Sequence, residues 1–457
     1  MSTAVGERPA RADQPAADPG PPPWTRRERW WLLGIVGVAL VLRWAWALHA
    51  ARDPVGLIDP TFYMIYGDQF AAGNGYTLPD GQPTAYYPVG YPGALGGVFW
   101  LGRHTFLPDD SPSLMAGFNI VLALATVVLV AELVRRLFRD NRLGLVAAAV
   151  VALWPNLVFH SAVALTETLF NFLVVAGLVV LVAGRWADRR LGPWRLLAAG
   201  VLFGASALVR PITFLLLPPL FVVWIGARFG WRRALQHVAL VAVAMVAVCT
   251  PWAIRNARVM DSLTLSTNLG DNLCIGRHKG ASGGYSLTEE CFPPGRYDHL
   301  RRPEYETRRN AETTEKALRY VLHHPLEEVR LIGQRARITF RNDHDGLRAA
   351  ESYDFDRFLG SGTRGALAWI ADAFFFAACA LTVLALPRLW RTGWASGRLL
   401  VLTMLAMALP PLIFFGDVRF HLPVLPFMAG AVAVALVQVL PGWWTAARRR
   451  RGTPAPA

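Results

Sequence analysis

The sequence predicts an all-α polytopic membrane protein, a bundle of about ten transmembrane helices with two large extracytoplasmic loops that carry surface helices. Of the 457 residues, 54% are hydrophobic and only 17% are charged. Apolar runs of helix length also recur along the chain, more of them than a single soluble core needs. The net charge of +14 does not indicate a nucleic-acid partner, because the arginines cluster beside the apolar runs, where they act as topology signals.

The chain divides into two tails and one membrane domain. Residues 1–28 are rich in Pro, Ala and Arg without an apolar core, which favours a disordered cytoplasmic tail over a signal peptide. Residues 29–445 form the membrane domain, and residues 446–457 form a basic cytoplasmic tail. The apolar runs lie at 29–49, 113–135, 143–161, 164–184, 195–209, 211–226, 234–254, 364–386, 397–415 and 418–440.

The runs 195–209 and 211–226 are each shorter than the roughly 20 residues of an upright span. Arginine groups at 185–195 and 228–233 flank the pair, and both groups are expected inside, so an even number of crossings separates them. We therefore predict two short helices that break at Arg210–Pro211, because proline opposes helix continuation.

The same rule predicts a multi-pass protein of the plasma (inner) membrane with both termini in the cytoplasm. Loops 50–112 and 255–363 are then outside. Cys274 and Cys291 both fall in the second loop, where an oxidising compartment favours a disulfide, with two free thiols as the alternative. Apolar residues at helical spacing on both sides of Pro325 predict two helices that lie on the outer membrane face or pack against the loop.

The stretch GLIDPTFYMIYGDQFAAGNGY, at 56–76, places two carboxylates just after the first span. Asp59 precedes Pro60, which suits the first position of a helix running to about Ala72, so Asp59 is predicted to be the N-cap. Asp68 lies nine residues later, about half a turn around the helix. The two carboxylates should therefore point in opposite directions and not form a paired site.

A set of motifs in this order resembles the polytopic GT-C glycosyltransferases, which include protein O-mannosyltransferases and lipid A aminoarabinose transferases. The motifs are Asp59-x-x-x-Tyr63, AAGNGYTLPDG, YYPVGYPGAL at 86–95, ALWPNLVFHSAVALTETLFNFLVV at 152–175, ALVRPITFLLLPP at 207–219, TPWAIRNARVMDSLTLSTNLGDNLCIG at 250–276, ALRYVLHHP at 317–325 and RFHLPVLPF at 419–427. The resemblance runs from the first span to the last. It implies a GT-C-like bundle that transfers a sugar from a polyprenyl-phosphate carrier on the external face.

In that family an acidic residue of the first loop acts as the base, and the resemblance gives this role to Asp59. Many members have two adjacent acidic residues at this position, whereas this chain has Pro60 beside Asp59. Glu167, in ALTET, is the candidate for a second catalytic carboxylate. Stabilisation of a helix start is the alternative for Glu167.

Such a transfer needs a base for the acceptor hydroxyl and cations for the charge that builds on the departing phosphate. Arg210, Arg255 and Arg419 lie at predicted external span ends and are candidates to bind the lipid phosphate, as is His421. Each has an alternative: Arg255 anchors a span end, Asp417 pairs with Arg419, and His421 bonds a local backbone group.

Tyr63, Tyr86 and Tyr87 are candidates to line the substrate site by stacking on a sugar ring, with an interfacial aromatic belt as the alternative. The cluster NDHDG at 342–346 lacks the ligand spacing of zinc or calcium sites, so it is interpreted as a turn; no metal site is predicted, and a divalent cation stays an open alternative. No phosphate-binding Gly-rich loop is visible, which favours a lipid-linked donor over a nucleotide sugar.

The sequence therefore predicts an inverting glycosyltransferase that moves a sugar from a polyprenyl-phosphate carrier to a hydroxyl of a glycan, lipid or protein acceptor. One alternative is a lipid or glycan transporter or flippase, although no repeated halves are visible. Another is a ligase that uses a diphosphate-linked glycan. The identity of the sugar and of the acceptor is not encoded in any motif we recognise.

Overall fold

The computed structural model describes residues 21–105, 110–184, 186–187, 191–391 and 393–442. These residues form helices and loops with two isolated β-bridges and no strand, so the all-α prediction is confirmed for them. The predicted tail 446–457 lies outside the described residues, as does most of the tail 1–28. Of that first tail, residues 21–28 are described, and they include the start of the first helix.

The bundle consists of long helices joined by short helical turns. Its helices are α1 (Arg26–Ala50), α4 (Ser111–Phe138), α5 (Asn141–Leu153), α6 (Pro155–Phe159), α7 (Glu167–Leu181), α8 (Pro193–Val209), α9 (Leu217–Trp224), α10 (Trp231–Val259), α15 (Ser361–Arg391), α16 (Arg398–Ala408), α17 (Pro410–Ile413) and α18 (Leu425–Val434). The turns are η1 (His160–Ala162), η2 (Pro211–Leu216), η3 (Ile225–Phe229), η5 (Gly393–Gly397), η6 (Val418–Val424) and η7 (Ala435–Val439).

The two long loops carry helices of their own. The first loop holds α2 (Asp59–Ala71) and α3 (Gly90–His104). The second holds α11 (Leu269–Ile275), α12 (Arg302–His323), α13 (Pro325–Thr339), α14 (Asp345–Ala350) and η4 (Ser352–Asp354). The break between α12 and α13 falls at Pro325, as predicted, because proline has no N–H for the helix that precedes it and suits the first turn of the next.

Each of the ten predicted apolar runs coincides with one helix or with two or three consecutive helices and helical turns. Among the described residues, six segments are long and apolar enough to cross a membrane, or seven if the bent pair 141–153 and 155–162 is one span. The segments 167–181, 193–209 and 211–227 are apolar but shorter. The chain is thus a multi-pass membrane protein, and the count of ten crossings stays a prediction.

The predicted helix break at Arg210–Pro211 is present. Helix α8 ends at Val209, and Arg210 has an extended backbone with φ −145° and ψ 112° before Pro211 begins η2. The residue before a proline disfavours the helical conformation, which explains the extended backbone. Arg210 therefore lies between α8 and η2 and belongs to neither, and its side chain lines the cavity described below.

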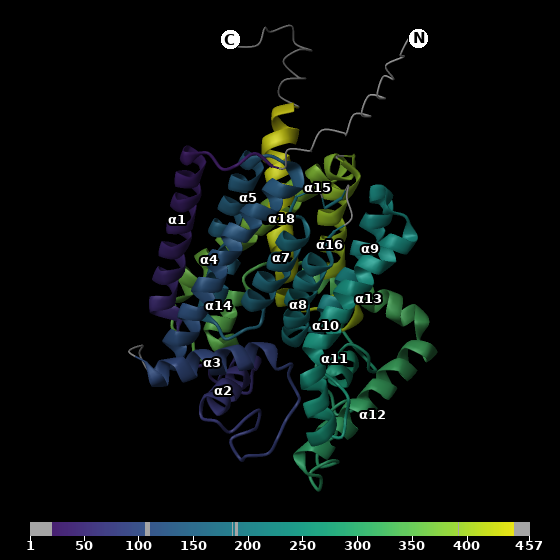
Figure 1. Ribbon diagram of the computed structural model, residues 1–457. Helices are drawn as coiled ribbons and strands as arrows, with labels where there is room; N and C mark the ends of the chain where they lie inside the picture. The colour runs from purple at the N-terminus through teal and green to yellow at the C-terminus, as the bar shows by residue number, and fades with distance from the viewer. Residues whose placement is uncertain (1–20, 106–109, 185, 188–190, 392, 443–457) are drawn as a thin grey trace, which may run out of the picture.

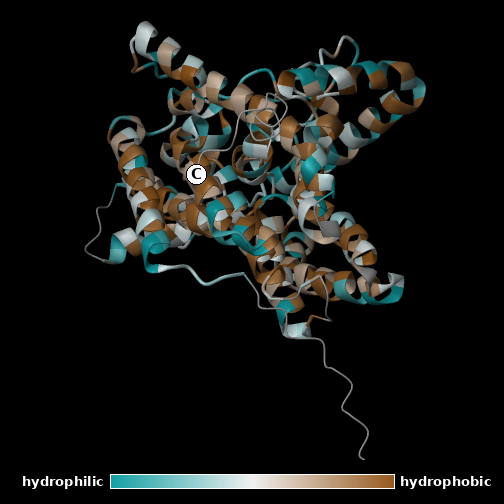
Figure 2. Cartoon of the chain, turned by 90° about the horizontal axis from the view of Figure 1, so that it is seen from above, coloured by the Kyte–Doolittle hydropathy of each residue, from teal (hydrophilic) through white to brown (hydrophobic). Residues whose placement is uncertain are grey.

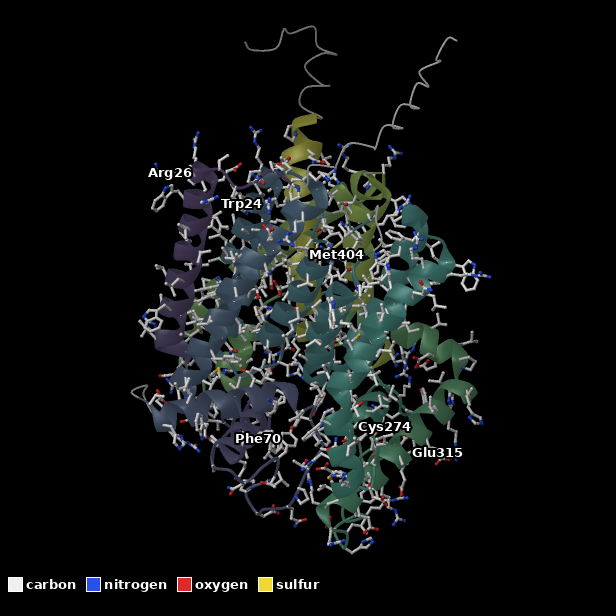
Figure 3. The ribbon with its side chains drawn as sticks, in the orientation of Figure 1. Trp24, Arg26, Phe70, Cys274, Glu315 and Met404 are labelled. Carbon is white, nitrogen blue, oxygen red and sulfur yellow. A yellow bond between two sulfur atoms is a disulfide. The ribbon has the colours of Figure 1, made fainter. Side chains whose placement is uncertain are left out.

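Both long loops lie at the same end of the bundle, which we call the loop end. Figure 1 shows α2, α3, α11 and α12 together at this end. In Figure 3, Phe70, Cys274 and Glu315 lie there, whereas Trp24 and Arg26 lie at the opposite end. Segments separated by some 200 positions in the sequence can therefore build one site, as the contacts below show.

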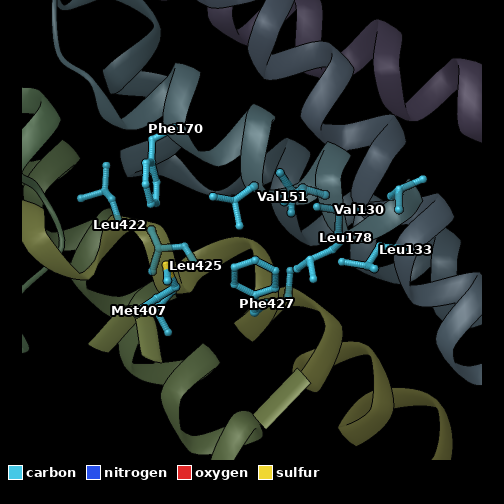
Figure 4. Close-up of a cluster of buried hydrophobic side chains, with 14 of the residues drawn as sticks. Val130, Leu133, Val151, Phe170, Leu178, Met407, Leu422, Leu425 and Phe427 are labelled. Carbon is cyan, nitrogen blue, oxygen red and sulfur yellow. The ribbon is translucent and has the colours of Figure 1, made fainter. Parts of the chain in front are cut away.

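The centre of the bundle is packed with aliphatic and aromatic side chains from α4, α5, α7, η6 and α18 (Figure 4). Among them Val130, Phe170 and Leu425 are almost fully buried. In a membrane such packing stabilises by van der Waals contact rather than by removing apolar surface from water.

Large apolar side chains also lie exposed on the outside of the bundle, and Figure 2 shows that hydrophobic residues, in brown, make up much of its helices. On α1 the side chains of Trp30 and Val41 are 64% and 65% exposed. An apolar face of this extent is stable against lipid and unfavourable against water, which agrees with a membrane protein.

Cys274, in α11, and Cys291 form a disulfide with their Cα atoms 5.8 Å apart. The bridge closes a loop with a sequence separation of 17 residues in the second long loop. A cross-link of this size removes conformational entropy from the unfolded chain.

We expect the double variant Cys274→Ala/Cys291→Ala to lose about 3 kcal/mol of stability through that entropy. Thermal unfolding of the purified protein in detergent, with and without a reducing agent, measures the effect. The matched control is Cys379→Ala, because Cys379 is a free cysteine. Equal unfolding temperatures for the double variant and the control would contradict a stabilising bridge.

Candidate active site

A cavity of about 1160 Å³ is bordered by both long loops and by the ends of the bundle helices. Its charged lining residues are arginines and aspartates: Arg210, Arg302, Arg309, Arg341, Arg348, Arg419, Asp59, Asp345 and Asp417. Positive side chains outnumber negative ones, so the cavity suits an anionic ligand. This is the candidate active site.

Asp59 is the first residue of α2, not its N-cap, so the N-cap prediction was wrong. The N-cap is Ile58, whose extended backbone makes no side-chain cap. The carbonyl of Ile58 accepts from the N–H groups of Thr61 and Phe62 at 3.1 and 3.3 Å. Because the backbone of Ile58 begins the helix, the Asp59 carboxylate is free to contact other side chains.

The Asp59 carboxylate contacts two side chains from other parts of the chain. The Tyr87 hydroxyl donates to Oδ1 at 2.7 Å, and Arg419 Nη2 lies 2.5 Å from Oδ2. The side chains of Asp59 and Arg419 are 24% and 17% exposed, so this ion pair is partly shielded from water.

Opposing effects act on the pKa of Asp59. Burial raises the pKa, but the charge of Arg419 and the hydrogen bonds from Tyr87 and Arg419 outweigh burial and hold it below its ordinary value. Burial also raises the pKa of Tyr87 well above its usual range, so its hydroxyl stays protonated and donates. Asp59 is therefore ionised at neutral pH.

Arg210 lines the same cavity, and its guanidinium group forms an ion pair with Glu167. Arg210 Nη2 lies 2.9 Å from Glu167 Oε1, and the Glu167 side chain is buried. Glu167 is not among the residues that line the cavity, and its described charged partner is Arg210. The guanidinium carbons of Arg210 and Arg419 lie 5.7 and 5.4 Å from the ring centre of Phe420, which brings both cations to one wall.

Arg255 and His421 do not line this cavity. Arg255 donates to the carbonyl oxygens of Thr84 and Tyr76 at 2.7 and 3.0 Å and so fastens the first loop to α10. The buried His421 ring contacts the Thr339 carbonyl through Nδ1 and Asp343 Oδ1 through Nε2, both at 2.8 Å. Both contacts correspond to the local, structural alternatives.

The three predicted tyrosines all line the cavity. The rings of Tyr63 and Tyr86 each meet the Tyr87 ring edge to face with centroids 4.9 Å apart. The Tyr86 hydroxyl donates to Asp271 Oδ2 at 2.9 Å. Tyr63 and Tyr87 are buried, which differs from the exposed position of an aromatic belt.

Asp68 lies away from the cavity and pairs with Arg103 at 2.8 Å. The two carboxylates of α2 therefore have different partners, as the helical spacing predicted. Asp68 supplies a matched control for Asp59 on the same helix.

Side chains of the NDHDG cluster have hydrogen-bond partners within the protein. Asp343 accepts from Trp154 Nε1 at 2.6 Å and from Asn156 Nδ2 at 2.5 Å, and His344 Nδ1 lies 2.9 Å from Asp372. In the part of the chain that the structure describes, no group of three His, Cys, Asp or Glu side chains is arranged to hold a metal ion.

Sequence reasoning missed three charged residues of the cavity: Asp345, Arg341 and Arg348. All three belong to the segment RNDHDGLR at 341–348, whose density of charge in an otherwise apolar chain was the available signal. It also missed Arg302 and Arg309, which line the cavity while paired with Glu306 and Asp271.

Comparisons with known proteins find relatives of this chain. Residues 104–254 match a family model described as dolichyl-phosphate-mannose-protein mannosyltransferase. One relative is an undecaprenyl phosphate-alpha-4-amino-4-deoxy-L-arabinose arabinosyl transferase from Pseudomonas aeruginosa strain UCBPP-PA14. The two sequences are 33% identical over 244 residues, which cover 50% of this chain and 41% of that protein. A relative of the same description from strain LESB58 is 32% identical over 143 residues, which are 30% of this chain and 25% of the relative. The chain thus spans less than half the length of these curated relatives.

Among solved structures, the archaeal oligosaccharyltransferase AglB from Archaeoglobus fulgidus, in complex with an inhibitory peptide and a dolichol-phosphate, matches with a TM-score of 0.53. The match has 14% identity and covers 94% of this chain and 53% of that chain, so it concerns the fold alone. The family model and the curated relatives are glycosyltransferases that use lipid-phosphate sugars by name, and the solved structure has a similar fold. The predicted resemblance to the GT-C glycosyltransferases is confirmed.

Proposed function

We propose that this protein is an inverting membrane glycosyltransferase that moves a sugar from a polyprenyl-phosphate carrier to an acceptor hydroxyl. The observation that carries the proposal is one cavity in which the ionised Asp59 contacts Arg419, with Arg210 on the same wall. The relatives' names describe undecaprenyl-phosphate and dolichyl-phosphate sugars as donors, which favours a donor of that class here.

In the proposed reaction the acceptor oxygen bonds to C1 of the sugar, and the bond from C1 to the phosphate oxygen breaks. The acceptor proton passes to Asp59, the base that the resemblance implies. The phosphate leaves as a monoester with one additional negative charge, which Arg210 and Arg419 stabilise through charge-assisted hydrogen bonds. Attack opposite to the phosphate inverts the configuration at C1.

The ion pair between Asp59 and Arg419 links donor binding to activation of the base. A donor phosphate competes with Asp59 for Arg419, because both are anions that suit a guanidinium. When Arg419 turns to the phosphate, Asp59 loses the main cause of its lowered pKa while burial continues to raise it. Asp59 then becomes a stronger base at the moment when the donor is present.

We further propose that the cavity faces the extracytoplasmic side of the inner membrane, with both termini cytoplasmic. The arginines at the end of α4 support this orientation, since Arg135 donates to the Pro22 carbonyl near the start of α1, at the end opposite to the loop end. Clustered arginines favour the cytoplasmic side, and a disulfide at the loop end favours the oxidising side. A glycan, a lipid or a protein can supply the acceptor hydroxyl.

The proposal is tested by incubating the purified protein in detergent with radiolabelled polyprenyl-phosphate sugars, polyprenyl-diphosphate-linked glycans and membrane acceptors. We expect transfer from a monophosphate donor by the wild type and by Asp68→Asn. Transfer from a diphosphate donor alone would indicate a ligase. No transfer from any donor, together with movement of lipid-linked sugar across vesicles, would indicate a transporter and reject the proposal.

A further inference from the structure

A second aspartate, Asp345, lines the same cavity as Asp59 from a different wall. It is the first residue of α14, and the whole residue is 4% exposed. Its contacts differ from those of Asp59. Tyr353 donates to Oδ2 from 3.4 Å, and His160 Nε2 lies 3.9 Å from the same oxygen. Asp59, in contrast, has an arginine at 2.5 Å.

The segment around Asp345 is held firmly against α6 and η1. A Cβ on Gly346 would lie 2.7 Å from His160 Cδ2 and 2.9 Å from Asn156 Oδ1, so only glycine allows this approach. The Gly346 N–H donates to Asn156 Oδ1 at 2.8 Å. On the other side, Asp343 is bonded to Trp154, Asn156 and His421. The position of Asp345 is thus set by buried hydrogen bonds on both sides.

Tyr353, the hydrogen-bond donor to Asp345, is held in an unusual backbone conformation. Ser352, Tyr353 and Asp354 have φ values of 50°, 52° and 83°, a left-handed region that residues other than glycine rarely adopt. Conformations of this kind persist where the surrounding structure imposes them, and they cluster at functional sites. Here the conformation accompanies the contact between the Tyr353 hydroxyl and Asp345.

His160, on the other side of Asp345, is 1% exposed, and neither of its ring nitrogens has a hydrogen-bond partner among the described residues. Behind it lies a small inner cavity of about 20 Å³, lined by His160, Arg43 and Glu167 among others. Such a volume can hold one water molecule. His160 therefore lies close to Asp345 and also lines this inner cavity, to which Arg43 and Glu167 contribute charged side chains.

The charged groups around Asp345 leave it less firmly ionised than Asp59. They come from η1 (His160), η4 (Tyr353), η6 and the residue before it (Arg419 and Asp417), α7 (Glu167) and α14 itself (Arg348). On α15, Asp372 faces His344. Burial, followed by the charge of Asp417, raises the pKa of Asp345 to about 7, although Arg419 and Arg348 oppose the rise.

We propose that Asp345 is the general acid of this site, which donates a proton to the departing phosphate oxygen, while Tyr353 and His160 are positioning residues. This inference rests on the proposed function. Asp345 lines the same cavity as Arg341, and the charges of Arg419 and Arg348 are close enough to act on it, so cations that suit a lipid phosphate lie near this carboxyl group. A neutral carboxyl group admits an anionic phosphate, whereas a carboxylate would repel it. Two carboxyl groups in environments that separate their ionisation are the usual arrangement of an acid and a base.

The proton balance is complete with these two residues. The acceptor O–H bond breaks and its proton goes to Asp59, while the Asp345 O–H bond breaks and its proton goes to the phosphate oxygen that leaves C1. With this proton the phosphate monoester departs as a monoanion, so Asp345 neutralises the additional negative charge that Arg210 and Arg419 would otherwise stabilise alone. Asp59 then returns its proton through solvent, and Asp345 takes one up, before the next turnover.

The test is the pH dependence of kcat/KM for the donor and acceptor found in the transfer assay. A general acid is active when protonated, so wild-type kcat/KM should be present below about pH 7 and fall as the pH rises through the pKa of Asp345. Asp59 cannot cause this decline because its pKa is lowered. We expect Asp345→Asn to reduce kcat about 10²-fold and to remove the decline above pH 7. Donor KM should stay unchanged, since an amide is as neutral as the protonated acid.

Two further variants separate a chemical role from a structural one. Tyr353→Phe removes a hydrogen bond to the ionised form of Asp345, so its pKa should rise and the decline should move to higher pH. Asp354→Asn is the matched control, because Asp354 is on the same turn but pairs with Arg357 outside the cavity. This control should keep the wild-type profile. An unchanged profile in Asp345→Asn would overturn the proposal.

The ionisation of Asp345 can also be followed without turnover. Infrared difference spectra of the full-length wild type and Asp345→Asn between about pH 5 and 9 isolate the carboxylic C=O band of this residue. We expect a midpoint near neutral pH. Ionisation throughout this range would reject Asp345 as the acid even if the protein transfers sugar. Absence of transfer in the wild type would reject the proposed function, while this titration would still decide the protonation of Asp345.

Discussion

Replacing Asp59 by Asn should lower kcat for sugar transfer by about 10²–10⁴-fold, the largest effect expected for any single substitution in this protein. The amide keeps the size of the carboxylate and can still accept a hydrogen bond from Tyr87, but it cannot take the acceptor proton. Donor binding should not weaken, because the change removes the anion that competes with the phosphate for Arg419. Single-turnover rates and donor binding, measured separately on the purified protein, provide the check.

Asp68→Asn is the control for this variant, since Asp68 belongs to the same helix and pairs with Arg103 outside the cavity. A change in thermal stability shared by both variants would indicate an effect on α2 rather than on the chemistry. If Asp59→Asn transferred sugar at the wild-type rate, Asp59 would not be the base, and the role that the resemblance implies would have to move to another residue.

Replacing Arg419 by Gln should lower kcat by about 10²–10³-fold, because a guanidinium that stabilises the leaving phosphate is lost. The same change should raise the pKa of Asp59, since burial would act without its main opposing charge. A base is active when ionised, so transfer is lost as the pH falls through its pKa. The acid-side decline of kcat/KM should therefore move to higher pH in Arg419→Gln than in the wild type.

Arg255→Gln is the matched control, because Arg255 is also an arginine at a span end but donates to the carbonyl oxygens of Tyr76 and Thr84. Its loss should reduce thermal stability and leave the pH profile in place. Two observations together would refute the assigned role of Arg419. The first is an acid-side decline at the same pH as in the wild type. The second is a kcat within a factor of about two of the wild type, because the loss of even one hydrogen bond is expected to have a larger effect.

A phosphate site on Arg419 and Arg210 also explains why Glu167 is buried behind the cavity. A buried arginine without a partner is unfavourable, and Glu167 compensates the charge of Arg210 from the side that faces away from the ligand. Glu167 was a candidate for a second catalytic carboxylate because it begins an apolar helix at the same end. The side chain of Asp345, from a helix that the sequence analysis did not predict, occupies the cavity wall instead.

By itself the sequence determined the apolar helices of the bundle and the breaks at two of its prolines. Hydrophobic runs must be helical in a membrane, because every backbone N–H and C=O group needs an internal partner there, and prolines mark where the helices end. The ten predicted runs and the breaks at Pro211 and Pro325 follow from these local rules. The order of motifs was enough to indicate a resemblance to GT-C enzymes and to single out Asp59.

Only the tertiary structure decided which charges share the cavity. Asp59 and Arg419 are 360 positions apart, and no periodicity relates them. Arg255 and Arg419 have similar positions at span ends, yet one holds loop carbonyls and the other meets Asp59, because the folded loops bring different groups to each. Charge interactions depend on distance and on burial, and both are set when the two loops pack together at one end of the bundle.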